Sequence, residues 1–382
     1  MNIFLAAGKI STKKAGIGNY VFHLVKGLAD LDQSNHYYVF CGTHWRREKR
    51  ENMSLFGTAP QNFTFSMPRI PSNYFKLLMN VAANTTGKIL FRGIDLYHET
   101  DNVPFPAPRR VKVVNTIHDL SRFLLPQIVE FDAKKMVDYW NRNKKAMTEV
   151  DRIITVSNHS KRDICEYLRV PEEKVTVVYN GISNLYRPLK PEILTKELQR
   201  LGLRDPYILY AGTITPKKNV GGLLRAYSLL SERRRDIPPL FLVGSKGWGS
   251  GPILKLIEEL KISKQVNYMG YVSDRDLAVI YNGASIFMYP SFYEGFGFPP
   301  LEAMACGCPT IVSNVSSLPE VVGDAAELVD PKDHEEIACS IEKLLSDKAK
   351  QETMRQKGMA RAQMFSWDDT VRKTLKLYEE LA

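Results

Sequence analysis

Short apolar runs alternate with segments of helical periodicity along the first half of the chain. After the first run, Val21, Leu24, Val25 and Leu28 recur at the spacing of one helix face. This alternation predicts a parallel β-sheet that is covered by helices on both faces. We expect its strands at residues 3–6, 37–40, 94–97, 111–116, 152–156 and 175–178.

A second series with the same alternation follows a proline-containing linker near residue 190. Helical periodicity recurs at residues 220–230 and 253–260, and Ser366 or Asp368 can cap a last helix. We predict an α/β fold with two Rossmann-like, doubly wound domains. Ligands of such sheets bind beyond the carboxyl ends of the strands, so we expect the site in a cleft between the domains. The expected strands lie at 207–210, 240–243, 266–269, 286–289 and 310–312.

The predicted domains are residues 1–190 and 191–367. Residues 368–382 form a C-terminal helix that is a candidate to cross back to the N-terminal domain.

The composition is that of a globular protein: 44% of the 382 residues are hydrophobic and 25% are charged. Disordered, collagen-like and disulfide-framework classes are therefore excluded. The five cysteines lack metal-ligand spacing, and we expect reduced thiols and no metal. Neither a leader peptide nor a run of about 18 apolar residues is visible. We expect a cytoplasmic protein, and peripheral attachment to the cytoplasmic face of the membrane is compatible with this.

The positive charge is confined to the first half. Residues 1–190 carry 28 Lys and Arg against 17 Asp and Glu, whereas residues 191–382 carry 24 against 25. Such a field attracts phosphates, nucleic acid or anionic lipid without choosing among them. Basic and aromatic residues mix at 69–92, and further basic residues follow at 134–145. An anionic membrane surface is thus a candidate partner, and a basic domain without membrane contact is the alternative.

The segment 290–302 has the strongest chemical pattern. It follows a predicted strand and ends in prolines that suit the first turn of a helix. Gly295 and Gly297 allow close approach of a ligand to the backbone, and N–H groups at a helix start suit phosphate. Glu294 and Glu302 flank this loop and could grip sugar hydroxyls. The alternative is that Glu294 caps the loop and Glu302 compensates the helix dipole.

Glu294 and Glu302, within Glu-Gly-Phe-Gly-Phe-Pro-Pro-Leu-Glu, resemble the signature of the retaining family 4 glycosyltransferases. That family has the GT-B fold, in which two Rossmann-like domains face each other across a cleft. The resemblance implies that residues 1–190 form the acceptor-side domain and residues 191–367 the domain that binds the nucleotide sugar. The resemblance spans nearly the whole chain, because other landmarks occur in order. They are residues 16–20, 117–120, 155–157, 179–181, 211–213, 216–219 and 317–323.

The resemblance implies that Glu294 contacts the transferred sugar and that Glu302 holds the ribose hydroxyls. Backbone at Phe296 and Gly297 would hold sugar hydroxyls and the distal phosphate. The resemblance also implies that backbone groups near residues 270–272 contact the nucleotide base. The implied donor-binding set is Gly16, Gly18, Gly212, Thr213, Lys217, Lys218, Gly244, Tyr271, Val272, Gly295, Phe296, Gly297, Leu301 and Glu302.

Lys218 matches the family lysine that neutralises the diphosphate, whose charge grows as the glycosidic bond breaks. Thr213 stands where the family often has arginine, so one bidentate phosphate contact is missing. Lys217 is the candidate substitute. Two lysines at a helix start are unfavourable without an anion, which favours a phosphate site over a solvated surface.

The first loop offers a competing cofactor site. Gly16 and Gly18 could begin a dinucleotide motif, but position 21 is valine, and no carboxylate follows the second strand. NAD binding is therefore disfavoured. In the resembling family this loop approaches the donor phosphates instead.

His118 follows a predicted strand and should project into the cleft. The resemblance assigns it contact with the transferred sugar, which makes His118 and Glu294 the predicted catalytic residues. Asp119 and Lys13 are the predicted acceptor-side residues. We expect no metal and no cofactor other than the nucleotide-sugar substrate.

The expected activity is retaining transfer of a hexose onto a saccharide or lipid-linked saccharide. The segments 117–120 and 216–219 resemble bacterial mannosyltransferases of polysaccharide assembly, such as that of lipopolysaccharide, so GDP-mannose is the expected donor. A UDP-hexose donor is the alternative, and a sugar phosphorylase or hydrolysing epimerase is another enzyme class with this fold. A nucleic-acid-binding protein is less compatible, because no helix-turn-helix, RRM or zinc-finger signature is found. The acceptor, the linkage position and the oligomeric state stay open.

Overall fold

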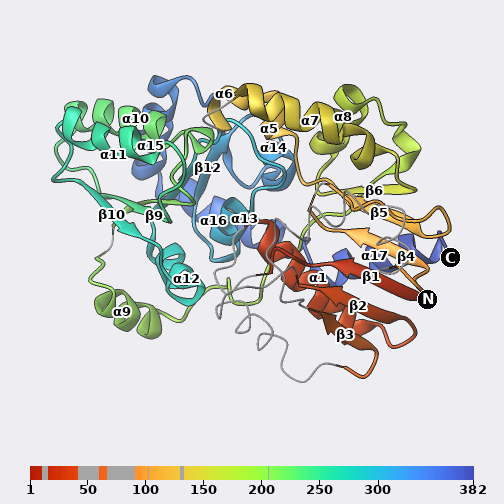
Figure 1. Ribbon diagram of the computed structural model, residues 1–382. Coiled ribbons are helices and arrows are strands. Elements are labelled where there is room, and N and C mark those ends of the chain that lie inside the picture. The colour runs from red at the N-terminus through yellow and green to blue at the C-terminus, as the bar shows by residue number, and fades with distance from the viewer. Residues whose placement is uncertain (11–15, 42–59, 67–90, 102, 130–132, 205) are drawn as a thin grey trace. The chain divides into compact units, whose positions relative to one another are not determined.

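The computed structural model describes residues 1–10, 16–41, 60–66, 91–101, 103–129, 133–204 and 206–382. The chain divides into two compact units (Figure 1). The first comprises Met1–Leu120, Val137–Gly181 and Ser366–Ala382, and the second comprises Ser121–Met136 and Ile182–Phe365. The C-terminal segment therefore belongs to the same unit as the N-terminal half of the chain.

The first unit contains a parallel sheet with the strand order β3-β2-β1-β4-β5-β6-β7. The six strands expected in this half are confirmed, and β3 was not expected because only two of its four residues are apolar. The strands are β1 (Asn2–Ala6), β2 (His36–Phe40), β3 (Phe63–Ser66), β4 (Leu96–Glu99), β5 (Lys112–Thr116), β6 (Arg152–Thr155) and β7 (Val175–Val177). The helices are α1 (Ile17–Leu31), α8 (Asn158–Leu168), the 3₁₀ helix η2 (Glu172–Lys174) and α17 (Trp367–Glu379), while α7 (Ala133–Thr148) begins in the second unit and continues in the first.

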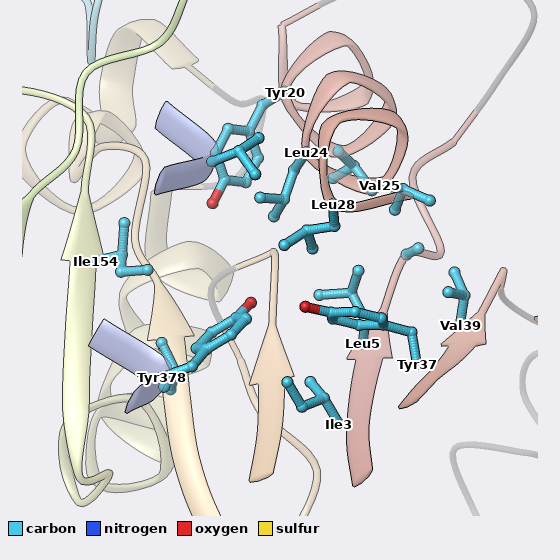
Figure 2. Close-up of a cluster of buried hydrophobic side chains, with 14 of the residues drawn as sticks. Ile3, Leu5, Tyr20, Leu24, Val25, Leu28, Tyr37, Val39, Ile154 and Tyr378 are labelled. Atoms are coloured by element: carbon cyan, nitrogen blue, oxygen red, sulfur yellow. The ribbon is translucent and has the colours of Figure 1, made fainter. Parts of the chain in front are cut away.

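The core of the first unit follows from strand alternation. Successive side chains of β1 point to opposite faces, so Ile3 and Leu5 enter one cluster while Phe4 and Ala6 enter another. Figure 2 shows the first cluster, in which α1 and α17 pack over the strands. The cap of α17 is as expected, because the Ser366 side chain accepts a hydrogen bond from the backbone N–H of Asp368.

The second unit repeats the plan with the parallel order β10-β9-β8-β11-β12-β13. All five expected strands are confirmed, and β13, in which only Val329 is buried, was not expected. The strands are β8 (Ile208–Ala211), β9 (Leu240–Val243), β10 (Val266–Gly270), β11 (Ile286–Tyr289), β12 (Thr310–Ser313) and β13 (Glu327–Val329). The helices are α5 (Ser121–Leu124), α6 (Pro126–Val129), α9 (Pro191–Arg200), the 3₁₀ helix η3 (Pro216–Lys218), α10 (Val220–Arg233), α11 (Ser250–Glu259), α12 (Asp274–Gly283), α13 (Phe298–Ala305), α14 (Leu318–Val322), α15 (His334–Ser346) and α16 (Lys348–Ala362).

Each sheet reverses its strand order once, between β1 and β4 in the first unit and between β8 and β11 in the second. Such switch points leave a crevice beyond the carboxyl ends of the two strands, where α/β proteins bind ligands. The five cysteines form no disulfide. Of the helices in the described ranges, none combines the length and apolar character needed to cross a bilayer.

Candidate functional site

Glu294 lies in the loop between β11 and α13, at the switch point of the second sheet. Only 7% of the residue is exposed. Its backbone N–H donates to the Ser316 hydroxyl at 2.9 Å. The Ser317 hydroxyl donates to the carbonyl oxygens of Glu294 and Phe296, each at 2.9 Å. The loop after β12 therefore fixes the backbone that carries this carboxylate.

Lys218 is the principal partner of Glu294. Its Nζ lies 2.6 Å and 2.7 Å from the two carboxylate oxygens and 2.7 Å from the Tyr289 hydroxyl. The lysine stands at the end of η3, which begins at Pro216 after β8. Asn219 then turns the chain with φ 53° and caps α10 through its side chain. The two segments that the sequence assigned to phosphate and sugar are thus joined by one ion pair.

The charges around Glu294 keep it ionised. Burial alone raises the pKa of a carboxyl group, but Lys218 and Lys217 act in the opposite direction. Hydrogen bonds from Lys218 and Ser291 add to the lysine charges, and the pKa of Glu294 lies below its ordinary value. A carboxylate in this state accepts hydrogen bonds, as recognition of sugar hydroxyls requires.

The start of α13 adds N–H donors beside this pair. Gly297 precedes the helix with φ 112°, a conformation that L side chains rarely adopt. A Cβ built there would lie 2.8 Å from the Leu318 side chain. Pro299 and Pro300 in the first turn carry no N–H, and the Leu301 N–H donates to the Gly297 carbonyl oxygen at 3.4 Å. The N–H groups at this helix start that can favour negative charge are therefore those of Gly297 and Phe298. Gly295 and Phe296, also predicted to bind donor, are both buried in this loop.

Glu302 lies on α13 and is also 7% exposed. Its carboxyl accepts a hydrogen bond from the Tyr281 hydroxyl at 3.2 Å. The pKa of Glu302 is raised to about 8, chiefly by burial. Hydrogen bonds from Tyr281 and Tyr186 partly oppose this effect, and the charge of Asp274 adds to it. Glu294 and Glu302 therefore sit in opposite electrostatic environments, and at neutral pH only Glu294 is held firmly ionised.

Gly212 and Gly244 form a side-chain-free patch at the ends of β8 and β9. Their φ angles are 152° and 137°. A Cβ on residue 244 would lie only 2.0 Å from the Gly212 carbonyl oxygen, so position 244 requires glycine. Thr213 follows and is exposed.

Other predicted donor residues differ in accessibility. Tyr271 is 50% exposed, whereas Leu301 has no exposed surface and packs in the core. Val272 is half-buried after β10. The Lys217 Nζ donates to the Ser121 hydroxyl at 3.3 Å, a contact within the second unit.

His118 follows β5 in the first unit and is 8% exposed. Its Nε2 lies 2.9 Å from the carbonyl oxygen of Thr100. A carbonyl only accepts, so Nε2 carries the proton, and Nδ1 of the neutral ring is an acceptor. Burial lowers the pKa of His118, although the Thr100 carbonyl and the charges of Asp101 and Asp119 oppose that effect.

The remaining predicted residues of the first unit lie at its strand ends. Gly16 precedes α1 with φ 48°, and a Cβ on Gly18 would lie 2.9 Å from the Lys9 carbonyl oxygen. Asp119 is half-buried. Lys13 lies outside the described residues, as do residues 67–90 of the predicted basic and aromatic segment.

The structure thus brings together Lys218, Glu294 and the start of α13. It adds partners that the sequence did not single out, chiefly Tyr289, Tyr281 and Ser316. Periodicity places such tyrosines in the core, and no local pattern indicates that their hydroxyls point to carboxylates. Within the described residues, no group of three or more His, Cys, Asp or Glu side chains could hold a metal ion.

Comparisons with known proteins cover both halves of the chain. The model of glycosyltransferase family 4 matches residues 15–184, and that of glycosyl transferases group 1 matches residues 195–361. The chain is 34% identical over 398 aligned positions to O-antigen chain mannosyltransferase B of Escherichia coli, with both chains fully covered.

Two solved structures share the fold. Sucrose-phosphate synthase from Thermosynechococcus elongatus has a TM-score of 0.79 at 22% identity and covers 100% of this chain and 99% of its own. HepE of Anabaena, in complex with UDP-glucose, has a TM-score of 0.73 at 19% identity, and both chains are fully covered.

Proposed function

Because the chain belongs to the family 4 glycosyltransferases and has their GT-B fold, we propose that it transfers mannose from GDP-mannose to a saccharide or lipid-linked saccharide. The choice of mannose is supported by the full-length relative, whose name specifies a mannosyltransferase of O-antigen chains. Assembly of a bacterial surface polysaccharide is the process that fits that relative.

The ion pair of Lys218 with Glu294 beside the start of α13 carries the chemical part of the proposal. Lys218, Lys217 and the backbone N–H groups of Gly297 and Phe298 would supply positive potential for a diphosphate. Lys218 also holds the Glu294 carboxylate within 2.7 Å, where it can accept hydroxyls of the hexose next to that diphosphate. One ion pair between two segments would thus join the group that binds the leaving diphosphate to the group that binds the transferred sugar.

The reaction would proceed with retention of configuration. The acceptor oxygen forms a bond to C1 of mannose on the face from which the diphosphate departs, and the bond from C1 to the phosphate oxygen breaks. The acceptor proton passes to that leaving phosphate oxygen. Lys218 and the start of α13 stabilise the negative charge on the departing diphosphate, which is the charge that develops in the transition state.

In this proposal the diphosphate would face Lys217, Lys218 and the backbone N–H groups of Gly297 and Phe298, so we assign no divalent ion to the reaction. Transfer measured with and without EDTA tests this point directly. We expect equal rates, and a loss of activity that Mg²⁺ or Mn²⁺ restores would contradict the assignment.

Glu302 would hold the ribose of the nucleotide through its carboxyl group, which Tyr281 orients. Backbone groups near Gly270 and Tyr271 would contact the base. Since backbone contacts give few sequence clues to the base, the donor is best identified by experiment.

A donor panel tests the proposal. Binding and slow hydrolysis of GDP-mannose, UDP-glucose, UDP-N-acetylglucosamine and NAD are followed by NMR with the full chain. We expect selective binding of GDP-mannose. Selective binding of a UDP-sugar would replace the donor while keeping the enzyme class, and binding of NAD alone would contradict the donor assignment altogether.

Peripheral attachment to an anionic membrane is a separate part of the proposal. Lys134, Lys135, Arg142 and Lys145 on α7 are exposed, and basic side chains on a helix are attracted to anionic lipid. Flotation with vesicles of phosphatidylglycerol and phosphatidylcholine tests this. We expect binding at low salt that high salt abolishes, and absence of binding at low salt would refute the attachment.

A further inference from the structure

A fully buried histidine connects the C-terminal helix to the N-terminal sheet. His98, on β4, has no exposed surface, and its Nδ1 lies 2.5 Å from the Tyr378 hydroxyl of α17. Its Nε2 lies 2.7 Å from the Thr116 hydroxyl at the end of β5. Burial, and His118 when it is protonated, lower the pKa of His98 to about 3. The ring is therefore neutral, and a hydroxyl group satisfies each of its nitrogens.

The chain of hydrogen bonds continues from Thr116 to α1. The Thr116 hydroxyl lies 3.1 Å from the Tyr20 hydroxyl, and both side chains have no exposed surface. Figure 2 shows Tyr20 on α1 and Tyr378 on α17, both with their hydroxyl groups inside the same cluster. Two helices that are distant in sequence are thus joined through His98 and Thr116.

The Tyr20 ring ends this chain against His118. The two ring centroids are 4.8 Å apart, and the planes meet at 80°, which is an edge-to-face contact. On its other side, the His118 Nε2 lies 2.9 Å from the Thr100 carbonyl oxygen. The orientation of the His118 ring therefore depends on one backbone carbonyl and on a tyrosine that is itself held by hydrogen bonds.

We propose that the chain of buried side chains from Tyr378 to Tyr20 positions the His118 ring for its contact with substrate, so that the C-terminal helix supports transfer from within the first unit. This inference rests on the proposed function and on the contact with the transferred sugar that the family resemblance implies for His118. Tyr378, His98, Thr116 and Tyr20 are positioning residues, because they act through His118 and need not touch substrate.

The physical basis is the cost of leaving buried polar groups unpaired. Removal of the Tyr378 hydroxyl leaves the His98 Nδ1 without its partner in a site that water does not reach. The His98 ring can regain a partner only by turning, which disturbs Thr116 and then Tyr20. A small displacement of a group that orients a reacting sugar reduces turnover strongly.

A double-mutant cycle on the full chain tests the proposal. Tyr378→Phe should lower kcat about tenfold while the KM for the donor stays nearly unchanged. In a His118→Ala background the same substitution should cause no further loss, because the network acts through that ring. Tyr37→Phe is the matched control: Tyr37 is buried in the same cluster, but its hydroxyl bonds to Asp32 at 2.5 Å. It should keep the wild-type kcat.

Equal losses from Tyr378→Phe in the wild-type and His118→Ala backgrounds, or an unchanged kcat, would overturn the proposal. Should Tyr378→Phe fail to fold, Tyr20→Phe replaces it, since this variant keeps the ring against His118 and loses only the hydroxyl.

A second readout does not depend on the donor. In ¹⁵N NMR of the imidazole rings, with His118→Ala used for assignment, Tyr20→Phe and Tyr378→Phe should shift the His118 signals and Tyr37→Phe should not. Unshifted signals would refute the network even if mannose proves to be the wrong sugar. An inactive wild-type chain with the expected shifts would instead refute the proposed function.

Discussion

Variants of the Lys218–Glu294 ion pair can separate its contribution to stability from its proposed contribution to transfer. Both side chains are largely buried, with 18% and 9% of their surface exposed, and the lysine lies within 2.7 Å of both carboxylate oxygens. Lys218→Met leaves the Glu294 carboxylate buried, and among the described residues Lys217 is the cation that still lowers its pKa. Removal of one partner of such a pair costs about 3 kcal/mol, at the lower end for buried pairs because some exposure remains.

In a unit of this size that cost corresponds to a fall in Tm of about 6–12 °C, which calorimetry measures readily. Lys218→Met combined with Glu294→Gln removes both charges and should recover most of this loss. Neither variant should transfer mannose, because the diphosphate and sugar contacts are lost in both. The reasoning is refuted if the double variant is as unstable as the single one, or if Lys218→Met transfers at the wild-type rate.

The other predictions concern the same loop. Glu294→Ala should lose transfer and keep part of the donor binding, while Glu302→Ala should mainly weaken donor binding; near-wild-type activity in both would contradict the site, and titration calorimetry with turnover assays distinguishes these outcomes. Because the pKa of Glu302 is raised, the folded state keeps a proton that the unfolded state releases once the pH exceeds the ordinary carboxyl pKa. Glu302 therefore lowers the free energy of unfolding as the pH rises toward 8. Glu302→Gln should therefore gain stability relative to wild type between pH 5 and pH 8, in denaturation measured across that range; a constant difference would contradict the shift. Gly297→Ala should lower the free energy of unfolding by about 2 kcal/mol and weaken donor binding, because of the positive φ and the contact with Leu318. Adding Leu318→Ala should relieve the contact but not the backbone strain, so recovery should be partial. Full recovery in the double variant would show that φ is not the cause.

The strands and their order of appearance could be predicted because buried parallel strands are short apolar runs. The sequence did not predict the edge strands β3 and β13, each of which has a single buried residue. The positions of Glu294 and Lys218 in the chain were predictable from motif spacing, but their ion pair was not. It depends on β8 and β11 being neighbours in the sheet, which is a property of topology rather than of local pattern.

The hydrogen-bond partners were the least predictable part of the site. The sequence pattern predicts Tyr289 and Tyr281 to be core residues. The structure shows that the Tyr289 hydroxyl contacts Lys218 and that the Tyr281 hydroxyl donates to Glu302. The same holds for His98, a lone histidine whose role follows from two partners on other elements. Side chains that serve both core and site carry no separate signal in a single sequence.

The most direct test of the central claim is transfer itself. The purified full chain is incubated with GDP-mannose carrying ¹³C in the sugar and with a mannosyl oligosaccharide acceptor, and the product is examined by NMR. GDP-mannose has the α configuration, so retention predicts a new α-mannosyl linkage and release of GDP. A β-linked product would contradict the retaining mechanism. In a parallel incubation with UDP-glucose, transfer of glucose together with no transfer from GDP-mannose would contradict the donor.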